Sequence, residues 1–442
     1  MGECDRAEEV KGFMKDKNYQ ISIERNGTMM PVGVISGEDH RTARFSYLDE
    51  YLDKDAAVPV SISLPLQREA FSAKQTRQFF EGLLPEGFTR RSVAQYLHLD
   101  EDDYLSMLHL LGRECIGAVR IQEKGESPDT SYEPIVQEQL MELASQGAEK
   151  AAEILAKSHL SLTGASGKVG LYFDPQRNKW FLPGGTAPST HIVKQSHIRL
   201  DGIVTNEQLS MMTAAKCGIE VPVSFIMDLG KGEDNAVLYA ARRYDRTFDD
   251  SVKLINGLPC PLRLHQEDFS QAMGIPAAEK YEKSRLGYMG KMFELLRRVS
   301  SDPIRDQRKL LDMIIFCFLL GNTDAHIKNY SLLYGKNLRG IRLAPAYDLV
   351  STTVYESSTR EMAFYIGDSL LIDDISESSF RAVAAEINLG ERFIAGRFDA
   401  MCSHYREALR EASHELCESG FEKAGMMEEK ILKTGGYAII AG

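Results

Sequence analysis

Three polar residues in the C-terminal half of the chain have the types and spacing that magnesium-assisted phosphoryl transfer requires. Asp324 is followed by Asn329, and Asp348 comes after a further extended stretch. In protein kinases a catalytic Asp and a metal-binding Asn have four residues between them, and Asp324 and Asn329 have that separation. One carboxylate orients the attacking hydroxyl while other oxygens hold magnesium against a triphosphate. The spacing predicts an ATP-dependent kinase site.

A buried helix is predicted to hold the loop that carries Asp324. Residues 310–320 form an apolar run with helical spacing, and Gly321 suits the left-handed position that ends a helix. The alternative is that Asn322, Asp324 and Asn329 serve only in turns and caps, where such residues are common.

A short hairpin is predicted to return the chain to this loop. Extended runs at 330–334 and 340–343 flank a Gly-Lys-Asn turn. The hairpin brings Asp348 back beside Asn329, which makes Asp348 the second candidate metal ligand.

Residues 161–168 predict a phosphate-binding loop in front of the apolar strand 169–173. Small residues there let backbone amides approach phosphate oxygens. The loop is not a Walker A motif, because Leu162 and Val169 stand where that motif needs Gly and Ser or Thr. A glycine turn in a plain hairpin is the alternative. The candidate residues are Thr163, Gly164, Ala165, Ser166, Gly167 and Lys168.

A lysine and a glutamate extend the predicted nucleotide site. Lys194 ends the predicted strand 190–194, and Glu207 starts the next helical stretch. A lysine so placed neutralises the α and β phosphates, and a glutamate orients it. An exposed strand lysine is the alternative, so Lys194 counts only together with the loop before it and the acids behind it.

A hinge for the adenine ring is predicted after the apolar strand 237–241. Arg242, Arg243 and Tyr244 offer backbone donors and acceptors, and Tyr244 adds a flat apolar surface. Alternatively, the charged residues form only a salt-bridged edge. Within the catalytic loop, His326 and Lys328 are candidates for phosphate contacts or for structural roles.

Composition excludes several classes of protein. The chain has 442 residues, 43% of them hydrophobic and 26% charged, which is typical of globular proteins. Its net charge of −12 argues against a general nucleic-acid surface. The seven cysteines form no CxxC pair and there is no HExxH, so zinc-type spacing is absent. With no apolar run near the ~18 to 20 residues that span a bilayer, we expect a cytoplasmic protein without membrane contact.

The order of predicted elements indicates an α+β fold: a small N-terminal α/β domain, then a protein-kinase-like core with a sheet lobe and a larger all-helical lobe. A hairpin is expected around Asn26-Gly27, an extended segment at 61–66, helices at 79–84, 88–97 and 138–157, a strand at 117–121 and a linker at 123–135. The expected boundaries are 1–18 for a frayed leader, 19–135 for the N-terminal domain, 136–262 for the sheet lobe and 263–442 for the helical lobe.

Taken together, these motifs resemble the HipA family of bacterial toxin Ser/Thr kinases over nearly the whole chain. The resemblance rests on residues 63–67, 79–85, Gly164-Ala165 with Lys168, 190–194, 243–246, Gln266-Glu267-Asp268, Asn322-Thr323-Asp324 with His326 and Lys328-Asn329, and Tyr347-Asp348.

The resemblance implies roles for individual residues. Asp324 would be the catalytic base, with Asn329 and Asp348 as Mg²⁺ ligands. Residues 163–168 would form the nucleotide loop and 242–244 the hinge. The remaining implied contacts are Lys194, His326, Lys328 and Tyr347 to ATP, with Glu207 and Gln266 in support. Ser161 matches a serine that such kinases phosphorylate on themselves, which expels the loop and shuts the enzyme off.

The resemblance also implies partners. Family members pair with a small HipB-like helix-turn-helix antitoxin, and the complex represses its own operon, so DNA would be contacted only through the antitoxin. Known targets are aminoacyl-tRNA synthetases. The chain departs from the family at Ser166 and Gly167 in the nucleotide loop, at Arg242, and at Ala325. A pseudokinase scaffold for the antitoxin, and a kinase of a lipid or small molecule, remain as alternatives.

Overall fold

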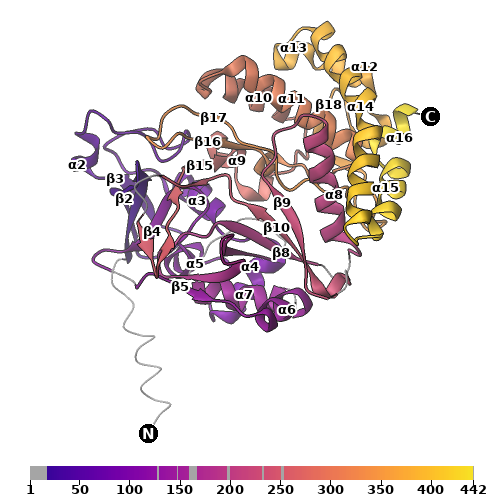
Figure 1. Cartoon of the computed structure of the whole chain (residues 1–442). Coiled ribbons are helices and arrows are strands. Elements are labelled where there is room, and N and C mark those ends of the chain that lie inside the picture. Colours follow the sequence, from indigo (N-terminus) through magenta and orange to yellow (C-terminus); the bar gives the residue numbers. More distant parts are fainter. Residues whose placement is uncertain are drawn as a thin grey trace.

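The computed structural model describes residues 17–126, 129–146, 148–158, 167–196, 200–230, 233–249 and 253–441. Figure 1 shows an N-terminal part in indigo and purple, a central sheet in magenta, and a largely helical part in orange and yellow. Most of the expected leader lies outside the described residues, but Lys17 and Asn18 already belong to the first strand.

A four-stranded antiparallel sheet in the order β3-β2-β1-β4 opens the fold. Its strands are β1 (Lys17–Arg25), β2 (Thr28–Gly37), β3 (Arg44–Tyr47) and β4 (Val119–Glu123). The predicted hairpin is confirmed: Asn26 and Gly27 adopt φ angles of 48° and 77° between β1 and β2, as a tight turn requires. The predicted strand at 117–121 is β4, which starts two residues later and pairs with β1.

Four helices accompany this sheet: α2 (Asp49–Leu52), α3 (Ala73–Phe80), α4 (Gly87–Tyr96) and α5 (Tyr104–Leu111). The helical stretch expected at 79–84 is present but divided, because α3 ends at Phe80 and the 3-10 helix η1 (Glu81–Leu83) follows; only its end at Leu84 is wrong. The extended segment expected at 61–66 is also wrong. Ser61 and Leu64 bridge each other across a tight turn, and Ser61 Oγ donates to Glu267 at 2.5 Å, a tertiary contact that local sequence does not reveal.

The central sheet has six strands in the order β5-β7-β6-β8-β10-β9. They are β5 (Ser131–Pro134), β6 (Lys168–Asp174), β7 (Lys179–Gly184), β8 (His191–Gln195), β9 (Ser224–Asp228) and β10 (Val237–Arg242). The expectation of a plain linker over 123–135 is therefore wrong at its end, because residues 131–134 pair with β7 as an edge strand. Two helices, α6 (Gln137–Gln146) and α7 (Ala148–Ser158), stand where one was expected at 138–157.

One helix and several short elements lie between β8 and the C-terminal part. Helix α8 (Ile203–Lys216) joins β8 to β9, and the 3-10 helix η2 (Asp234–Ala236) precedes β10. Two small ladders follow, in which β11 (Arg246–Thr247) pairs with β14 (Leu262–Arg263) and β12 (Leu254–Ile255) pairs with β13 (Leu258–Pro259).

The C-terminal part is mainly helical. Its helices are α9 (Phe269–Met273), α10 (Tyr288–Val299), α11 (Pro303–Leu320), α12 (Glu377–Ala382), α13 (Ala384–Ile387), α14 (Glu391–Glu418), α15 (Lys423–Thr434) and α16 (Gly436–Ala441), with 3-10 helices η3 (Ala277–Glu279), η4 (Ile327–Asn329) and η5 (Ile372–Asp374). The expectation of an all-helical lobe is wrong. The lobe also holds the sheet β15 (Gln266–Asp268), β16 (Ser331–Leu333) and β17 (Arg342–Leu343), and the pair β18 (Glu361–Ile366) and β19 (Ser369–Leu371).

Strand β10 separates two hydrophobic cores. Leu238 and Ala240 belong to the core shared with the N-terminal sheet, whereas Val237 and Tyr239 belong to the core of α8 and the C-terminal helices. Alternate residues of a strand face opposite sides of the sheet. The central sheet is thus covered on both faces, and its Tyr239 face is turned toward the helical lobe. Among the described residues, no helix has the length and apolar character needed to cross a membrane.

Candidate active site

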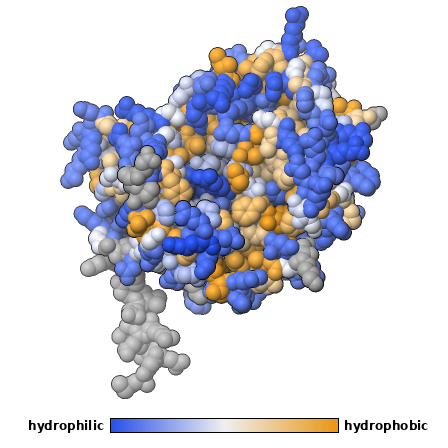
Figure 2. Space-filling model, in the orientation of Figure 1, coloured by the Kyte–Doolittle hydropathy of each residue, from blue (hydrophilic) through white to orange (hydrophobic). Residues whose placement is uncertain are grey.

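A cavity of about 380 Å³ lies where the N-terminal part, the central sheet and the helical lobe meet. Figure 2 shows a mainly hydrophilic periphery on one face of the molecule, with hydrophobic residues gathering toward the centre and lower part. The cavity is lined by the predicted residues Gly167, Lys168, Lys194, Glu207, Arg242, Arg243, Tyr244, Gln266, Asp324, His326, Lys328, Asn329, Tyr347 and Asp348. The other predicted residues, Ser161, Thr163, Gly164, Ala165 and Ser166, lie outside the described residues.

Strand register places two lysines side by side in this cavity. Lys194 in β8 is paired with Lys168 in β6 and with Tyr239 in β10. Directly opposed residues on adjacent strands share one face of the sheet, and Tyr239 faces the helical lobe. The Lys194 Nζ lies 5.5 Å from the centre of the Tyr239 ring. The sheet therefore presents two cations to the other lobe.

Asp348 forms ion pairs with both lysines. The Lys194 Nζ donates to Asp348 Oδ1 and to Glu207 Oε1 at 2.6 Å, and Lys168 Nζ lies 3.9 Å from Asp348 Oδ2. Burial opposes ionisation of Asp348, but Lys194 and Lys168 outweigh it and hold its pKa well below the usual range. Burial likewise opposes the charge of Lys194, yet Asp348 and Glu207 raise its pKa. Asp348 and Lys194 are therefore ionised, whereas burial lowers the pKa of Lys168 and raises that of Glu207.

The loop after α11 holds Asp324 and Asp348 in a fixed relation. Gly321 ends the helix with a φ of 74°, as predicted. Asn322 accepts from the Asp324 N–H at 3.2 Å and donates from Nδ2 to the Asp348 carbonyl at 3.3 Å. Asp348 itself has a φ of 58°, a left-handed conformation that non-glycine residues adopt mainly where the surrounding structure enforces it. Buried Asn322 thus couples the two acids through the backbone.

The orientation of Asn329 suits a metal ligand. Its Nδ2 donates to the Asp324 carbonyl at 2.9 Å, so its Oδ1 is the atom left to accept. Asn329 and Asp348 both line the cavity, and their oxygens are hard ligands of the kind that Mg²⁺ takes, usually together with water and substrate phosphates. The described residues hold no cluster of three His, Cys, Asp or Glu side chains that would bind a metal alone. The donor set therefore fits a Mg²⁺ that is shared with a nucleotide.

Asp324 is open to the cavity although protein surrounds it. Asp324 is exposed to solvent, but the protein around its carboxyl group partly desolvates that group and raises its pKa. The Tyr281 hydroxyl donates to Asp324 Oδ1, and this hydrogen bond acts in the opposite direction on that pKa. A carboxylate in this position is accessible to an incoming hydroxyl.

The side chains of Lys328 and His326 are buried among other protein groups. The Lys328 Nζ binds Asp268 Oδ2 at 2.6 Å and lies 3.4 Å from Glu86 Oε1, and its side chain is only 3% exposed. Burial, helped by the charge of Lys280, lowers the pKa of His326 to about 3. His326 is therefore neutral at physiological pH. Both residues line the cavity, but Lys328 already has anionic partners within the protein.

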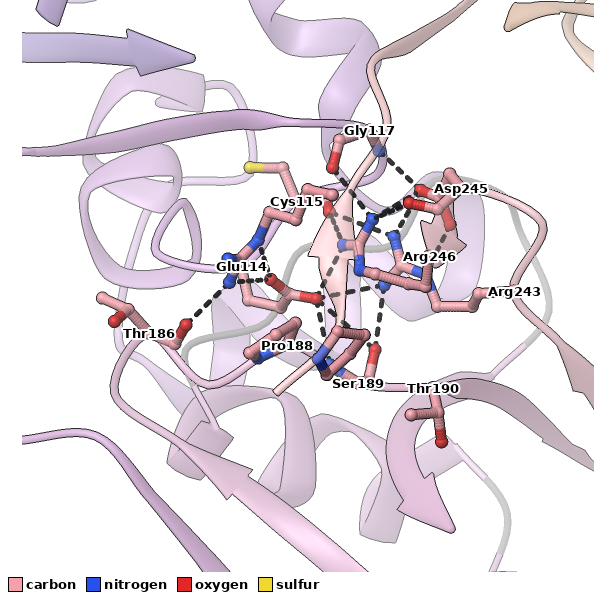
Figure 3. Close-up of polar contacts among 12 residues, drawn as sticks. Glu114, Cys115, Gly117, Thr186, Pro188, Ser189, Thr190, Arg243, Asp245 and Arg246 are labelled. Carbon is pink, nitrogen blue, oxygen red and sulfur yellow. Dashed lines mark hydrogen bonds and ion pairs between the residues drawn. The ribbon is translucent and has the colours of Figure 1, made fainter. Parts of the chain in front are cut away.

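The hinge segment divides its residues between the cavity and a buried ion-pair cluster. Figure 3 shows Arg243 and Arg246 directed toward Glu114 and Asp245. The Arg243 side chain is 1% exposed, with Asp245 at 2.7 Å and Glu114 at 3.3 Å. The Arg243 guanidinium is thus occupied by the protein itself, whereas the hinge prediction concerns the backbone groups of Arg243. The salt-bridged alternative describes the charged side chains.

Tyr244 lies between these charged residues and faces the cavity. Its N–H donates to no backbone oxygen of the described residues, so it remains available to a ligand. The ring lies 5.8 Å from that of Tyr347, and its hydroxyl donates to Gln266 Oε1. Tyr347 in turn donates to the Lys328 carbonyl at 2.9 Å. The two tyrosines, whose rings are inclined at 31° to each other, thus connect the predicted hinge with the loop that carries Asp324.

Sequence reasoning missed several residues of the cavity, among them Glu86, Lys280 and Tyr281. Lys280 Nζ binds Glu86 Oε2 at 2.7 Å. Burial would raise the pKa of Glu86, but Lys328 and Lys280 lower it to about 2. Glu86 directly follows the motif at 79–85, which was the one available signal. Nothing in the spacing of Lys280 and Tyr281 connects them to Asp324.

Comparisons with known proteins show which family the chain resembles. A family model described as the HipA-like C-terminal domain matches residues 160–409, and one described as the HipA N-terminal domain matches residues 27–122. The chain is 33% identical over 389 residues to "Putative kinase Y4mE" of Sinorhizobium fredii, covering 86% of this chain and 88% of that protein. It is 26% identical over 371 residues to "Serine/threonine-protein kinase toxin HipA" of Shewanella oneidensis, covering 81% and 82%.

A solved structure shares the fold. It is the complex of HipA, HipB and operator DNA of the Shewanella oneidensis toxin-antitoxin system, and one of its chains matches this one with a TM-score of 0.77. The match covers 96% of this chain and 97% of that chain at 24% identity. The arrangement of all three parts of the molecule is therefore the arrangement seen in that fold.

Proposed function

The chain belongs to the HipA family, and from this premise we propose that it is an ATP-dependent serine/threonine-protein kinase of a toxin-antitoxin system. One observation carries the proposal. Asp324, Asn329, Asp348 and the Lys194–Glu207 ion pair, which come from four separate parts of the fold, line a single cavity. Phosphoryl transfer needs these groups together, because its catalysis consists mainly of positioning and charge stabilisation.

In this proposal each group has one task. Lys194, oriented by Glu207, neutralises the α and β phosphates of ATP, and the neighbouring Lys168 adds a second cation. Asn329 and Asp348 would hold Mg²⁺, which supplies charge neutralisation at the transferring phosphoryl group. Asp324 accepts the proton of the acceptor hydroxyl. A triphosphate offers Lys194 new anionic partners, so its present bond to Asp348 can give way and leave that carboxylate to the metal.

The adenine ring is proposed to lie against Tyr244 and Tyr347. The available Tyr244 N–H and apolar neighbours such as Ile192 and Ala241 line the same end of the cavity. Such a mainly apolar wall with a few polar groups is typical of small-molecule sites. Arg243 contributes here through its fixed backbone, because its side chain is held by Glu114 and Asp245.

We further propose that Ser161 is an autophosphorylation site and that the external target is a protein of the translation apparatus, such as an aminoacyl-tRNA synthetase. The partner would be a HipB-like helix-turn-helix antitoxin, with DNA contacted only through it. The net charge of −12 supports indirect DNA contact, because direct binding relies on cations.

Phosphate transfer by the purified chain tests the proposal. With ATP and Mg²⁺, the wild-type chain should gain phosphate at Ser161, measured by mass spectrometry of its peptides. Asp324→Asn should still bind ATP but transfer at least about 100-fold more slowly, the usual loss when a general base is removed. Asp49→Asn, on the exposed surface of the N-terminal part, is the matched control and should transfer normally. A wild-type chain that binds ATP yet phosphorylates neither itself nor any protein of a cell extract would refute the kinase assignment.

A second experiment tests the toxin-antitoxin role. Expression of the wild-type chain alone should arrest growth, and co-expression of the helix-turn-helix protein encoded beside it should restore growth. Asp324→Asn should be harmless in the same cells. Quantitative phosphoproteomics after brief expression should identify the target as the protein whose phosphorylation depends on Asp324. Growth arrest that persists with Asp324→Asn would contradict a kinase toxin.

A further inference from the structure

A tyrosine from a distant segment touches the carboxylate proposed as the base. The Tyr281 hydroxyl donates a hydrogen bond to Asp324 Oδ1. Its ring packs edge-on against His326, with the ring centres 5.1 Å apart at an interplanar angle of 80°. Tyr281 lines the cavity and remains 38% exposed. The contact is therefore made within the proposed site, on the side of Asp324 that solvent can reach.

The segment that carries Tyr281 is anchored on both sides. Before it, Lys280 Nζ binds Glu86 Oε2 of the N-terminal part at 2.7 Å, and the Tyr288 hydroxyl donates to the Glu279 carbonyl at 2.8 Å. After it, the Glu282 N–H donates to the Ala363 carbonyl at 2.8 Å. The Glu282 side chain, only 2% exposed, accepts from the N–H groups of Leu286 and Tyr365 at 2.6 and 3.0 Å. Tyr281 is thus held in place by both lobes of the molecule.

A hydrogen bond to one carboxylate oxygen has two consequences for a general base. It fixes the rotation of the carboxylate, which leaves Oδ2 as the oxygen that can face an acceptor hydroxyl. It also favours the ionised form, because the bond is made to a negative oxygen. The phenol keeps its proton in this role, since burial and the charge of Asp324 raise the pKa of Tyr281 well above 10.

We infer that Tyr281 is a positioning residue for Asp324, which holds Oδ1 so that Oδ2 receives the proton of the acceptor hydroxyl during phosphoryl transfer. This inference rests on the proposed kinase function. In the step it serves, the bond from the acceptor oxygen to the γ-phosphorus forms and the bond from that phosphorus to the β-phosphate oxygen breaks. ADP leaves, and the acceptor proton passes to Asp324.

Tyr281→Phe tests the inference, because it keeps the ring against His326 and removes only the hydroxyl. We expect kcat for phosphate transfer to fall about tenfold, the effect of one hydrogen bond to a charged group. The KM for ATP should stay unchanged, since the nucleotide is assigned to Lys194 and Tyr244 rather than to Tyr281. A fall in kcat at an unchanged KM distinguishes positioning of the base from a merely structural role, which would alter both constants.

Tyr288→Phe is the matched control. It removes a phenol hydrogen bond to the same segment, at Glu279, without touching Asp324, so its kcat and KM should equal those of the wild type. An unchanged kcat in Tyr281→Phe would overturn the inference, and so would a faster rate, which would show that the phenol competes with the acceptor. If the wild-type chain transfers no phosphate although it binds ATP, the kinase proposal itself fails. If the wild-type chain is active, the results for Tyr281→Phe test only the positioning role of Tyr281.

Discussion

Replacing Glu114 with glutamine removes the charge at the centre of the buried cluster that joins the N-terminal part to the hinge. Its side chain is 1% exposed and contacts Arg243, Arg246 and Arg263 at 3.3, 2.8 and 2.6 Å. Glutamine keeps the size of the side chain and one acceptor oxygen, but it leaves three guanidinium groups without their shared anion. We expect a large loss of stability, because an uncompensated buried charge is costly.

The size of the loss follows from the charge state of Glu114. Burial opposes its ionisation, but the three arginines outweigh burial and lower its pKa from 4.5 to about 2. At about 1.4 kcal/mol for each pKa unit, the folded state favours the ionised form by about 3 kcal/mol. In other proteins, removal of one partner of a buried ion pair lowers the free energy of unfolding by about 3–5 kcal/mol. We therefore expect the free energy of unfolding to fall by about 3 kcal/mol.

The pH dependence has a defined sign. Since the pKa of Glu114 is lower in the folded state than in the unfolded state, its contribution is complete above pH 4.5 and is lost as the pH falls toward 2. The difference in stability between wild type and Glu114→Gln should be constant from pH 5 to 8 and should shrink below pH 4.5.

Urea unfolding followed by tryptophan fluorescence measures this effect. The chain has a single tryptophan, Trp180 in β7, which is 9% exposed and so reports unfolding of the central sheet. Asp49→Asn is the control, because Asp49 pairs with Arg68 on the surface, where both side chains are more than half exposed, and such pairs contribute about 0–1 kcal/mol. If Glu114→Gln cost no more than this control, the reasoning about the buried cluster would be refuted.

Three further predictions concern the cavity and the domain junction. Lys194→Met should weaken ATP binding by about tenfold or more in calorimetry, because the ion pair with Glu207 and the cation facing the phosphates are both lost. Asn329→Ala should raise the Mg²⁺ concentration needed for half-maximal transfer, and unchanged Mg²⁺ dependence would contradict its assignment as a ligand. Burial raises the pKa of Glu267 from 4.5 to about 7, so its contribution to stability is present below pH 4.5 and lost as the pH rises through 7. Glu267→Gln, which cannot ionise, should remove this part of the pH dependence of the melting temperature between pH 4.5 and 7.

Local patterns predicted the elements that depend on neighbouring residues. The stop of α11 at Gly321 and the β1–β2 hairpin at Asn26-Gly27 follow from backbone conformations that few other residues adopt easily. The five-residue step from Asp324 to Asn329 indicated the candidate catalytic loop for the same reason, because both residues lie on one short loop. The strand at 131–134 was not predicted. It is an edge strand among polar residues, and its partner β7 lies some 50 residues further along the chain.

Charge alone did not reveal which side chains serve the cavity. Arg243 and Tyr244 are adjacent in sequence, but one enters the cluster around Glu114 and the other faces the cavity. Lys328 has the sequence position of a phosphate ligand, yet Asp268 and Glu86 bind it inside the protein. In each case the deciding partner lies in another segment, and its distance from the residue along the chain carries no periodic signal.

The sequence by itself determined the chemical groups of this protein: a loop with Asp324 and Asn329, a strand lysine at 194 and an acid at 348, together with their resemblance to one family. Tertiary structure alone decided that these groups share a cavity, that Lys194 lies between Glu207 and Asp348, and that Tyr281 reaches Asp324. The physical reason is that helix ends, turns and motif spacings depend on neighbouring residues. Ion pairs and hydrogen bonds between distant segments depend on how two lobes pack, which no local pattern encodes.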